Sequence, residues 1–452
     1  MTAGNPEAAR AYDAALAYLF SATNYEKMRR VRYNADTFSL DRMHRLLAAL
    51  GDPHRRLRAV HVAGTKGKGS TAAMVHRLAV AAGLRTGLYT SPHLVDIRER
   101  IRIDERMIAA DALARLIRRA RPHVDRMRAA GDAPTFFEIF TALALDHFDR
   151  EAVDLAVAEV GLGGRLDATN VLRPQVAVIT AVSMDHTAQL GPTLAAIAAE
   201  KAGIVKRGVP VVSQPQPEAA AAVIRRTCRE AGAPLTEVGR EVTWSWSPAE
   251  REGRPGGRLT VRTPAGAYED LFLPLMGEHQ AVNAATALAS VEQVPGPADR
   301  LTPDLARDAL AALDWPGRMQ YVPATPAALL DGAHNRASME RLLEALAAHF
   351  PDRRTAVVFA AAADKDVDGM LDVLAGERAW AAVVFTRTNH PRAAEPATLA
   401  ERWSASAPRE AETAADVTNA LRVAREAVGR DGLVVVCGSL YLVGEATGIL
   451  DL

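Results

Sequence analysis

"HVAGTKGKGS", residues 61–70, closes the apolar run "LRAVHVA" and opens the alanine-rich stretch "TAAMVHRLAVAAGL". A strand, a glycine-rich turn and a helix in this order predict a phosphate site, because the first N–H groups of the helix face an anion. The spacing differs from G-x-x-x-x-G-K-[ST], since Val62 takes the place of the first glycine and Gly69 separates Lys68 from Ser70. Taken alone, the stretch therefore also fits a glycine-rich turn with surface lysines.

The composition bounds the class of protein. Of 452 residues, 49% are hydrophobic and 24% charged, which is typical of a globular chain with two or three domains. Lys plus Arg equals Asp plus Glu at 54 each, so we expect neither a nucleic-acid nor a membrane surface. The two cysteines exclude a disulfide framework and favour a reducing compartment, and no apolar run approaches the roughly 20 residues that span a bilayer. The start of the chain lacks the basic segment of a signal peptide, so we expect a cytoplasmic protein.

Strands and helices alternate along most of the chain. Apolar runs such as "VDLAVAEVG" and "QVAVITAVS" are separated by helical stretches up to about residue 215, which predicts a parallel sheet covered on both faces. Residues 242–274 interrupt this rhythm and are typical of a β-hairpin, with no motif that assigns them a role. The alternation returns with "AALLDGA", "TAVVFAAA" and "GLVVVCGS". We predict an α/β protein with a large domain over residues 1–313 and a smaller one over 314–452.

Polar residues gather at predicted strand ends. Glu159 interrupts one apolar strand, and Asp185 and His186 follow the next. The carboxyl ends of parallel strands meet at one edge of a sheet, where α/β proteins bind ligands. A carboxylate beside a triphosphate suits Mg²⁺, a cation that prefers oxygen ligands. The alternative for His186 is a hydrogen-bonded histidine at the end of a strand.

The second half of the chain carries weaker signals. "LLDGAHNR" places Asp331, His334 and Asn335 after a strand, where such residues often build turns and cap helices. "WPGRMQ" places Arg318 in a connector, where a lone arginine is usually a surface charge.

Together these stretches resemble one family over nearly the whole chain. The matching stretches are "HVAGTKGKGS", "TSPHL", "TFFEIFTALAL", "EVGLGGRLDATN", "MDHTAQLG", "EKAGIVK", "GEHQAVNAA", "WPGRMQ" and "LLDGAHN". In this order they resemble the folylpolyglutamate synthase/dihydrofolate synthase family of the Mur ligase superfamily. The resemblance implies an N-terminal Mur-ligase-like P-loop ATPase domain with a mostly parallel sheet and a smaller C-terminal Rossmann-like glutamate ligase domain. It also implies a monomer that uses ATP to join L-glutamate to a folate through an acyl phosphate.

The resemblance implies roles for individual residues. It places the ATP phosphates on Gly64, Thr65, Lys66, Gly67, Lys68, Gly69 and Ser70, and further nucleotide contacts on Asn283, Arg318, Asp331 and His334. Two Mg²⁺ ions would be held by Ser91, Glu159, His186 and a carbamylated Lys201, so that Lys68, His186 and Lys201 serve catalysis. The pteridine-side pocket would be formed by Thr135, Phe136, Phe137, Glu138, Leu166, Asp167 and Ala168. One of the two phenylalanines is expected to stack on the ring and the other to belong to the helix core.

Two residues depart from the family pattern, and several alternatives stay open. Lys66 stands where the family often has asparagine, and Arg336 replaces a proline common after "DGAHN". The chain could add the first glutamate to dihydropteroate as well as later ones, or only extend existing chains. The alternatives are a peptidoglycan-precursor ligase, disfavoured because no separate UDP-binding domain precedes the loop, and a nucleotide-binding ATPase without ligase activity.

Overall fold

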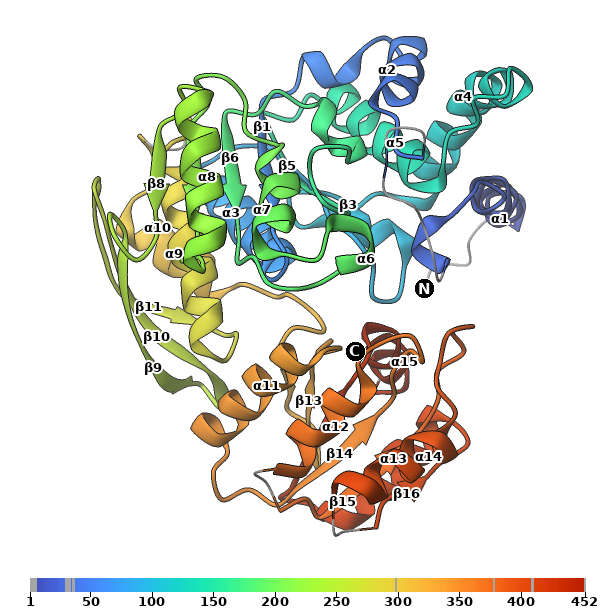
Figure 1. Cartoon of the computed structure of the whole chain (residues 1–452), viewed down its shortest axis with the longest axis vertical. Helices are drawn as coiled ribbons and strands as arrows, with labels where there is room; N and C mark the ends of the chain where they lie inside the picture. The colour runs from blue at the N-terminus through green and yellow to red at the C-terminus, as the bar shows by residue number, and fades with distance from the viewer. Residues whose placement is uncertain are drawn as a thin grey trace.

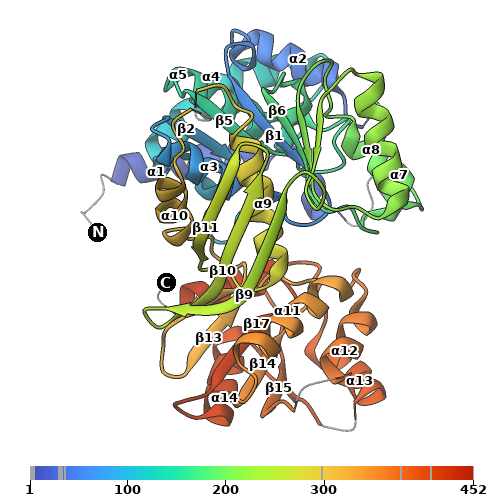
Figure 2. The same ribbon diagram turned by 90° about the vertical axis from the view of Figure 1, so that its left-hand side faces the viewer.

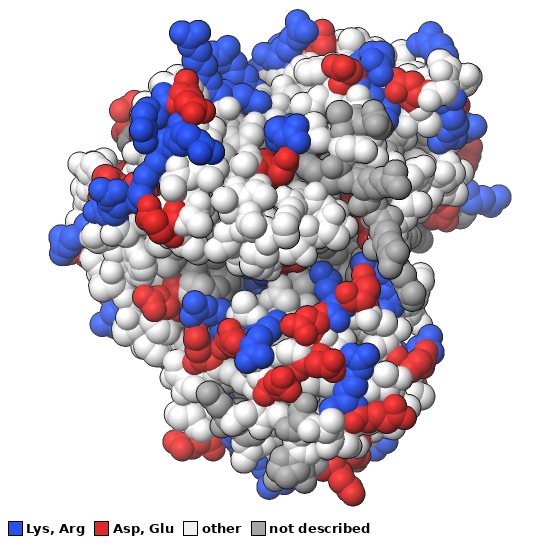
Figure 3. Space-filling view, viewed as in Figure 1, with Lys and Arg blue, Asp and Glu red and all other residues white. Residues whose placement is uncertain are grey.

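The computed structural model describes residues 6–28, 34, 37–296, 299–376, 379–407 and 410–450, and it contains three sheets. Figure 1 shows the first sheet and its helices above the C-terminal sheet and its helices. Within the described residues, no helix is both long and apolar enough to cross a membrane. On the face shown in Figure 3, basic and acidic side chains are interspersed over both halves, in keeping with the balanced composition.

The first sheet has the strand order β4-β3-β2-β5-β1-β6-β7-β8. Its parallel strands are β1 (Ala59–Ala63), β2 (Thr86–Tyr89), β5 (Leu155–Glu159), β6 (Val176–Ile179), β7 (Val211–Ser213) and β8 (Leu235–Glu237), and β3 (Ile101–Ile103) and β4 (Arg106–Met107) form an antiparallel edge. The central strands β1, β5 and β6 are buried on both faces, which is why they are continuous apolar runs in the sequence. The predicted α/β class with a mostly parallel sheet is confirmed.

Helices cover both faces of this sheet. The helices of the upper half are α1 (Pro6–Phe20), α2 (Leu40–Ala49), α3 (Lys68–Ala81), α4 (Ala110–Ala129), α5 (Phe136–Arg150), α6 (Thr187–Leu190), α7 (Leu194–Ala202), α8 (Glu218–Glu230), α9 (Glu278–Val291) and α10 (Pro303–Ala311), with short 3₁₀ turns η1 (Tyr25–Lys27), η2 (Pro53–Arg55), η3 (Ile97–Arg100) and η4 (Ala168–Val171). Successive strand residues point to opposite faces. Accordingly Val60 and Val62 pack with α3, α9 and α10, whereas Ala59 packs with α2, α4 and α5 and Ala63 with α7 and α8.

Residues 243–273 form an antiparallel sheet of three strands, β9 (Thr243–Arg251), β10 (Arg254–Thr263) and β11 (Gly266–Leu273), which confirms the expected hairpin. In Figure 2 this sheet extends from the upper half to the lower half of the molecule. Trp246 packs against the core around α9, and its ring also contacts His349, at the end of α11 (Arg336–His349), with 6.0 Å between centroids. The sheet therefore bridges the two halves.

The C-terminal sheet has the order β12-β13-β17-β14-β15-β16. Its strands are β12 (Gln320–Val322), β13 (Ala327–Leu330), β14 (Thr355–Phe359), β15 (Ala382–Phe385), β16 (Glu412–Thr413) and β17 (Leu433–Cys437), all parallel except β12. α11, α12 (Val367–Gly376) and α13 (Pro396–Ser406) cover one face, and α14 (Val417–Val428) and α15 (Leu440–Ile449) the other. A mostly parallel sheet with helices on both faces agrees with the smaller Rossmann-like α/β fold that the family resemblance implies.

Candidate active site

The glycine-rich loop joins β1 to α3 at the carboxyl edge of the first sheet. Its amides at Thr65 and Lys66 both donate to the carbonyl oxygen of Ala181, at 2.8 and 3.1 Å, which ties the loop to the segment after β6. α3 begins at Lys68, and the first N–H groups of a helix have no partner within it. The amides at the start of α3 therefore lie at the carboxyl edge of the sheet without a partner in the helix, and the amides of Thr65 and Lys66 anchor the loop.

Two glycines of this loop lie where no side chain fits. At Gly64, with φ +152°, a Cβ would lie 1.8 Å from Oγ1 of Thr180. At Gly67, with φ +85°, it would lie 2.5 Å from Oδ1 of Asn283. Asn283 itself is buried on α9, and its Oδ1 accepts a 2.8 Å hydrogen bond from Gln214. Asn283, on α9, thus packs against the loop at Gly67.

Glu159 lies at the end of β5, beside β1, as the strand-end argument predicts. It is only 5% exposed, and its Oε2 accepts a 3.0 Å hydrogen bond from the amide of Ser91. A Cβ on Gly69 would lie 3.4 Å from the same oxygen. Burial raises the pKa of Glu159, and the positive charge of Lys68 opposes this rise. A buried carboxylate thus faces the loop and needs cations nearby to stay ionised.

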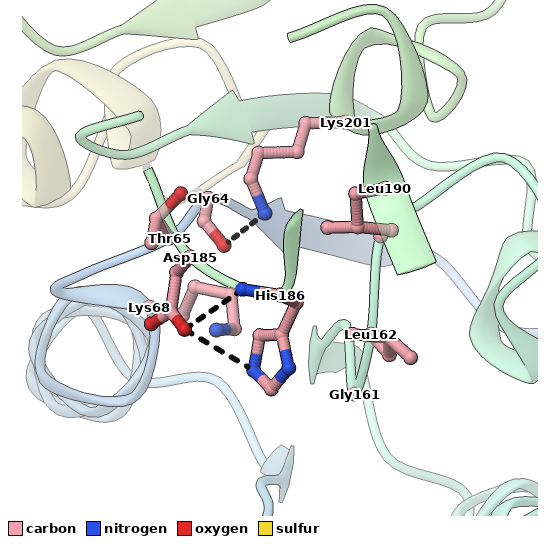
Figure 4. Close-up of a pocket in the computed structure, with 10 residues that line it drawn as sticks. Gly64, Thr65, Lys68, Gly161, Leu162, Asp185, His186, Leu190 and Lys201 are labelled. Carbon is pink, nitrogen blue, oxygen red and sulfur yellow. Dashed lines mark hydrogen bonds and ion pairs between the residues drawn. The ribbon is translucent and has the colours of Figure 1, made fainter. Parts of the chain in front are cut away.

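A small cavity of about 30 Å³ opens between the loop, the turn after β5 and α7 (Figure 4). Lys68, Asp185, His186 and Lys201 line it together with Gly161. Figure 4 shows Lys201 reaching toward the loop, where its Nζ donates to the carbonyl oxygen of Gly64 at 2.8 Å. The structure thus brings the predicted Lys68, His186 and Lys201 to one cavity.

The titratable groups of this cavity are strongly shifted. Burial and the neighbouring Lys68 lower the pKa of Lys201 to about 7. Partial burial lowers the pKa of His186 to about 4, so its imidazole is neutral at neutral pH. The ammonium of Lys66, 3.0 Å away, holds the pKa of Asp185 well below its usual range despite burial. Such opposed shifts in one cavity are typical of functional sites.

The C-terminal half contributes Arg318, near Glu159, and Asp331, near Arg318. Asp331 follows β13 and accepts hydrogen bonds from the amides of Met319, at 2.8 Å, and Ala333, at 2.9 Å. Burial raises the pKa of Asp331, whereas the charge of Arg318 lowers it. The charge of Arg318 also lowers the pKa of Glu159, so this arginine lies near enough to act on a carboxylate from each half.

His334 and one unpredicted lysine complete the junction. Nδ1 of His334 lies 2.8 Å from the carbonyl oxygen of Gly332, and burial together with Lys66 lowers its pKa to about 3. The charge of Lys365, after β14, also lowers the pKa values of His334, His186 and Asp185. Lys365 was not predicted from the sequence, and Asp185 was predicted at a strand end without a role. Both residues could have been found from the sequence, because each is a charged residue that follows the carboxyl end of a strand.

The predicted pteridine side divides into core and surface residues. Thr135 caps α5 and forms a capping box with Glu138, whose carboxylate also makes a buried 2.7 Å ion pair with Arg42. Phe136 is buried and stacks on Phe140 with 5.8 Å between centroids. These three predicted residues therefore build the start of α5.

Phe137 and the turn after β5 lie nearer the cavity. A Cβ on Gly161, which lines the cavity, would lie 2.5 Å from the tip of the Phe137 ring, and this ring is only partly buried. Asp167 is buried and accepts hydrogen bonds from the amides of Gly161 and Leu162, at 3.0 and 2.9 Å. Ala168 is buried next to it and Leu166 is partly exposed. Of the two phenylalanines, Phe137 is the one whose ring lies next to a residue that lines the cavity.

The chain also matches two family models, the Mur ligase middle domain over residues 62–291 and the Mur ligase glutamate ligase domain over residues 317–440. The fold, the phosphate loop and the junction between two α/β halves thus define an ATP-dependent ligase of the Mur type.

Relatives narrow the family. The dihydrofolate synthase/folylpolyglutamate synthase of Bacillus subtilis is 34% identical over 410 residues, which cover 90% of this chain and 93% of that protein. The structure of the Mycobacterium tuberculosis folylpolyglutamate synthase complexed with ADP superposes with a TM-score of 0.88 at 34% identity and covers 98% of this chain and 99% of that one. The chain belongs to the folylpolyglutamate synthase/dihydrofolate synthase family.

A further relative is longer. A probable bifunctional folylpolyglutamate synthase/dihydropteroate synthase of Haloferax volcanii is 38% identical over 446 residues. The match covers 96% of this chain and only 50% of that protein, so this chain spans about half the length of that relative.

Proposed function

We propose that the protein uses ATP to ligate L-glutamate to folates, both by extending tetrahydrofolate polyglutamates and by converting dihydropteroate to dihydrofolate. The observation that carries this proposal is the convergence of the phosphate loop, Glu159, Lys201 and the C-terminal Arg318 and Asp331 at one junction. The relatives from Bacillus subtilis and Mycobacterium tuberculosis, named for these two activities and for bound ADP, support it.

The chemistry proceeds in two transfers. An oxygen of the acceptor carboxylate attacks the γ-phosphorus of ATP, ADP leaves, and an acyl phosphate forms. The neutral amino group of glutamate then attacks the acyl carbon, a C–N bond forms, the nitrogen loses one proton, and inorganic phosphate leaves. A carboxylate is a poor acyl donor because oxide would have to leave, whereas phosphate leaves readily. The positive loop stabilises charge that moves onto the β-phosphate.

We assign the nucleotide to the loop and to the C-terminal junction. The N–H groups at the start of α3 and the ammonium of Lys68 would hold the phosphates, with Thr65 and Lys66 anchoring the loop. Arg318, Asp331 and His334 would contact the nucleotide from the C-terminal half, and Lys365 adds a cation for an anionic substrate.

We assign two Mg²⁺ ions to the edge between the loop and α7. Ser91, Glu159, His186 and Lys201 would hold them, completed by phosphate oxygens. The donor set fits, because Glu159 is a buried carboxylate and His186 is neutral. Within the described chain, no three His, Cys, Asp or Glu side chains form a metal site by themselves, and the proposed set adds the Ser91 hydroxyl, Lys201 and phosphate oxygens. When bound, Mg²⁺ would neutralise the phosphate charge.

We propose that Lys201 is carbamylated. Because burial lowers its pKa to about 7, a large share of the side chain is neutral amine at neutral pH. That amine adds CO₂ to give a carbamate and one proton, which replaces a cation by an anionic oxygen ligand. Incubation with ¹³CO₂ should give one carbamate carbon signal that Lys201→Met lacks. A signal in both proteins, or in neither, would contradict the carbamate.

The acceptor is assigned to Phe137 and the turn from Gly161 to Ala168. Phe137 would stack on the pteridine ring, and Asp167 holds the turn in place. We further propose a cytoplasmic monomer whose domain boundary lies between residues 313 and 314. The two buried free cysteines fit a reducing compartment.

Acceptor-dependent phosphate release tests the proposal. With MgATP and L-glutamate, we expect release with dihydropteroate and with tetrahydrofolate, and only background release without an acceptor. Release with tetrahydrofolate alone would limit the enzyme to chain extension. Acceptor-independent release would favour a plain ATPase, and release only with a UDP-linked precursor would favour a peptidoglycan ligase.

A further inference from the structure

His61 lies on β1, three residues before Gly64, and the assigned functions leave it without a role. It is fully buried, and its Nε2 lies 2.8 Å from Oγ1 of Thr169 in η4. Thr169 in turn contacts Asp167, the carboxylate that holds the turn after β5. A chain of side chains thus joins the strand that carries the phosphate loop to the pteridine-side turn.

The direction of these hydrogen bonds follows from the donors available. The Thr169 hydroxyl has a single proton, which it donates to Oδ1 of Asp167. It must therefore accept from His61, so Nε2 carries the imidazole proton. Burial lowers the pKa of His61 to about 3, which leaves one N–H on the ring. Within the described residues, Nδ1 of His61 has no hydrogen-bond partner.

Because Nδ1 has no hydrogen-bond partner, the value of a histidine at this position lies in its Nε2 donor. A buried polar atom without a partner costs free energy, and an apolar side chain in this core would avoid that cost. The Nε2 donor is what an apolar side chain would lack. It orients Thr169, and Thr169 orients Asp167.

The Asp167 carboxylate holds two residues that line the cavity. One carboxylate oxygen receives both the hydroxyl and the amide of Thr169, and the other receives the amides of Gly161 and Leu162, which line the cavity. The phosphate loop is fixed by separate contacts, from its amides to Ala181 and from Lys201 to Gly64. A substitution at His61 should therefore displace the turn after β5 more than it displaces the phosphate loop.

We propose that His61 is a positioning residue for the folate acceptor: through Thr169 it fixes the Asp167 carboxylate, and with it the turn at Gly161 and Leu162 against which the pteridine binds. This inference rests on the proposed function, which assigns that turn to the acceptor. It concerns acceptor binding and leaves ATP binding to the loop.

The test compares His61→Leu with His61→Gln. The glutamine amide N–H replaces the Nε2 donor, whereas leucine keeps bulk and removes it. We expect the KM for dihydropteroate to rise on the order of tenfold in H61L, as for one lost hydrogen bond. The KM should stay within about twofold in H61Q, and the KM for ATP should stay within about twofold in both. Equal KM values for dihydropteroate in H61L and H61Q, or parallel rises for ATP and dihydropteroate, would overturn the inference.

A second pair keeps the test decisive if H61L does not fold. Thr169→Val removes the hydroxyl and Thr169→Ser keeps it, so T169V should raise the dihydropteroate KM as H61L does and T169S should not. In the H61L/T169V double variant the effects should not add, because both break one chain. Additive effects would contradict the chain. Wild-type enzyme that releases no phosphate with any folate acceptor would instead refute the proposed function.

Discussion

At the scale of single residues, Lys68 and Glu159 form the charged centre of the candidate site. One comes from the phosphate loop and the other from β5, and they lie close enough for the charge of Lys68 to lower the pKa of Glu159. Neither is needed for the apolar core, so their removal should affect chemistry far more than folding.

Lys68→Ala and Glu159→Gln should each lower the turnover number by about 100-fold or more, the loss typical of a missing stabiliser of developing charge. Thermal unfolding of E159Q should occur at the wild-type temperature or above, because the substitution removes a buried charge while keeping an acceptor for the amide of Ser91. Retained turnover in either variant would refute the site assignment.

The adjacent phenylalanines should separate core from ligand contact. Phe136→Ala should destabilise the fold by about 3–5 kcal/mol, because this ring is buried against Phe140. Phe137→Ala should cost less stability and should raise the KM for the folate acceptor. Denaturant unfolding measures the stability and acceptor titrations measure the KM. A larger loss of stability in F137A, with a raised KM in F136A, would contradict these roles.

The sequence identifies residues whose type is unusual for their place. Glu159 interrupts an apolar strand, and Lys68 follows glycines before a helix, so both could be predicted. Phe136 and Phe137 could not be told apart, because a helix start turns neighbouring side chains in different directions. Lys365 was missed because a charged residue in a loop usually faces solvent. Lys201 could be predicted only from the family resemblance, because on a helix its burial leaves no mark in the sequence.

At the scale of elements, the join between β1 and α3 depends on the space at Gly64. Gly64→Ala would place a methyl group against Thr180, where the structure leaves no room, and should displace the loop. We expect ATP affinity to fall by tenfold or more. Gly83→Ala is the matched control, since Gly83 also has a positive φ, +82°, but nothing lies within 4 Å of its Cβ position. Calorimetric titration with ATP should separate the two, and equal affinities would show that the loop tolerates the methyl group.

The presence of the sheets could be predicted from the sequence, but their strand order could not. Apolar runs separated by helices predicted a parallel sheet, and the runs after residue 320 predicted a second one. The short strands β3, β4, β8, β12 and β16, at or next to the sheet edges, were not predicted, because they span only two or three residues and carry no periodic pattern. The bridging role of residues 243–273 depends on contacts such as that of Trp246 with His349, which no local pattern records.

At the scale of the whole molecule, the two halves meet through the segment that follows Ser91. Leu94 packs against the C-terminal core, and the carboxylate of Glu99 fixes this segment by accepting from the amide of Leu94 at 2.7 Å. On α15, a Cβ at Gly444 would lie 2.3 Å from the carbonyl oxygen of Leu94. Close docking of the halves therefore requires glycine at this position.

Gly444→Ala should push the halves apart and lower the turnover number several-fold while ATP still binds. Gly448→Ala, on the same helix with nothing within 4 Å of its Cβ position, should leave turnover unchanged. Steady-state kinetics of the two variants, with small-angle scattering for the separation, measures the effect. Equal turnover in both would mean that the junction does not need this contact.

In the proposed reaction, the acceptor carboxylate is activated as an acyl phosphate at this junction. The most direct measurement uses dihydropteroate labelled with ¹⁸O in its carboxylate, together with ATP and L-glutamate, and determines the isotope content of the released phosphate. We expect one ¹⁸O atom in each phosphate that is released as an amide bond forms. Unlabelled phosphate released alongside amide formation would contradict it.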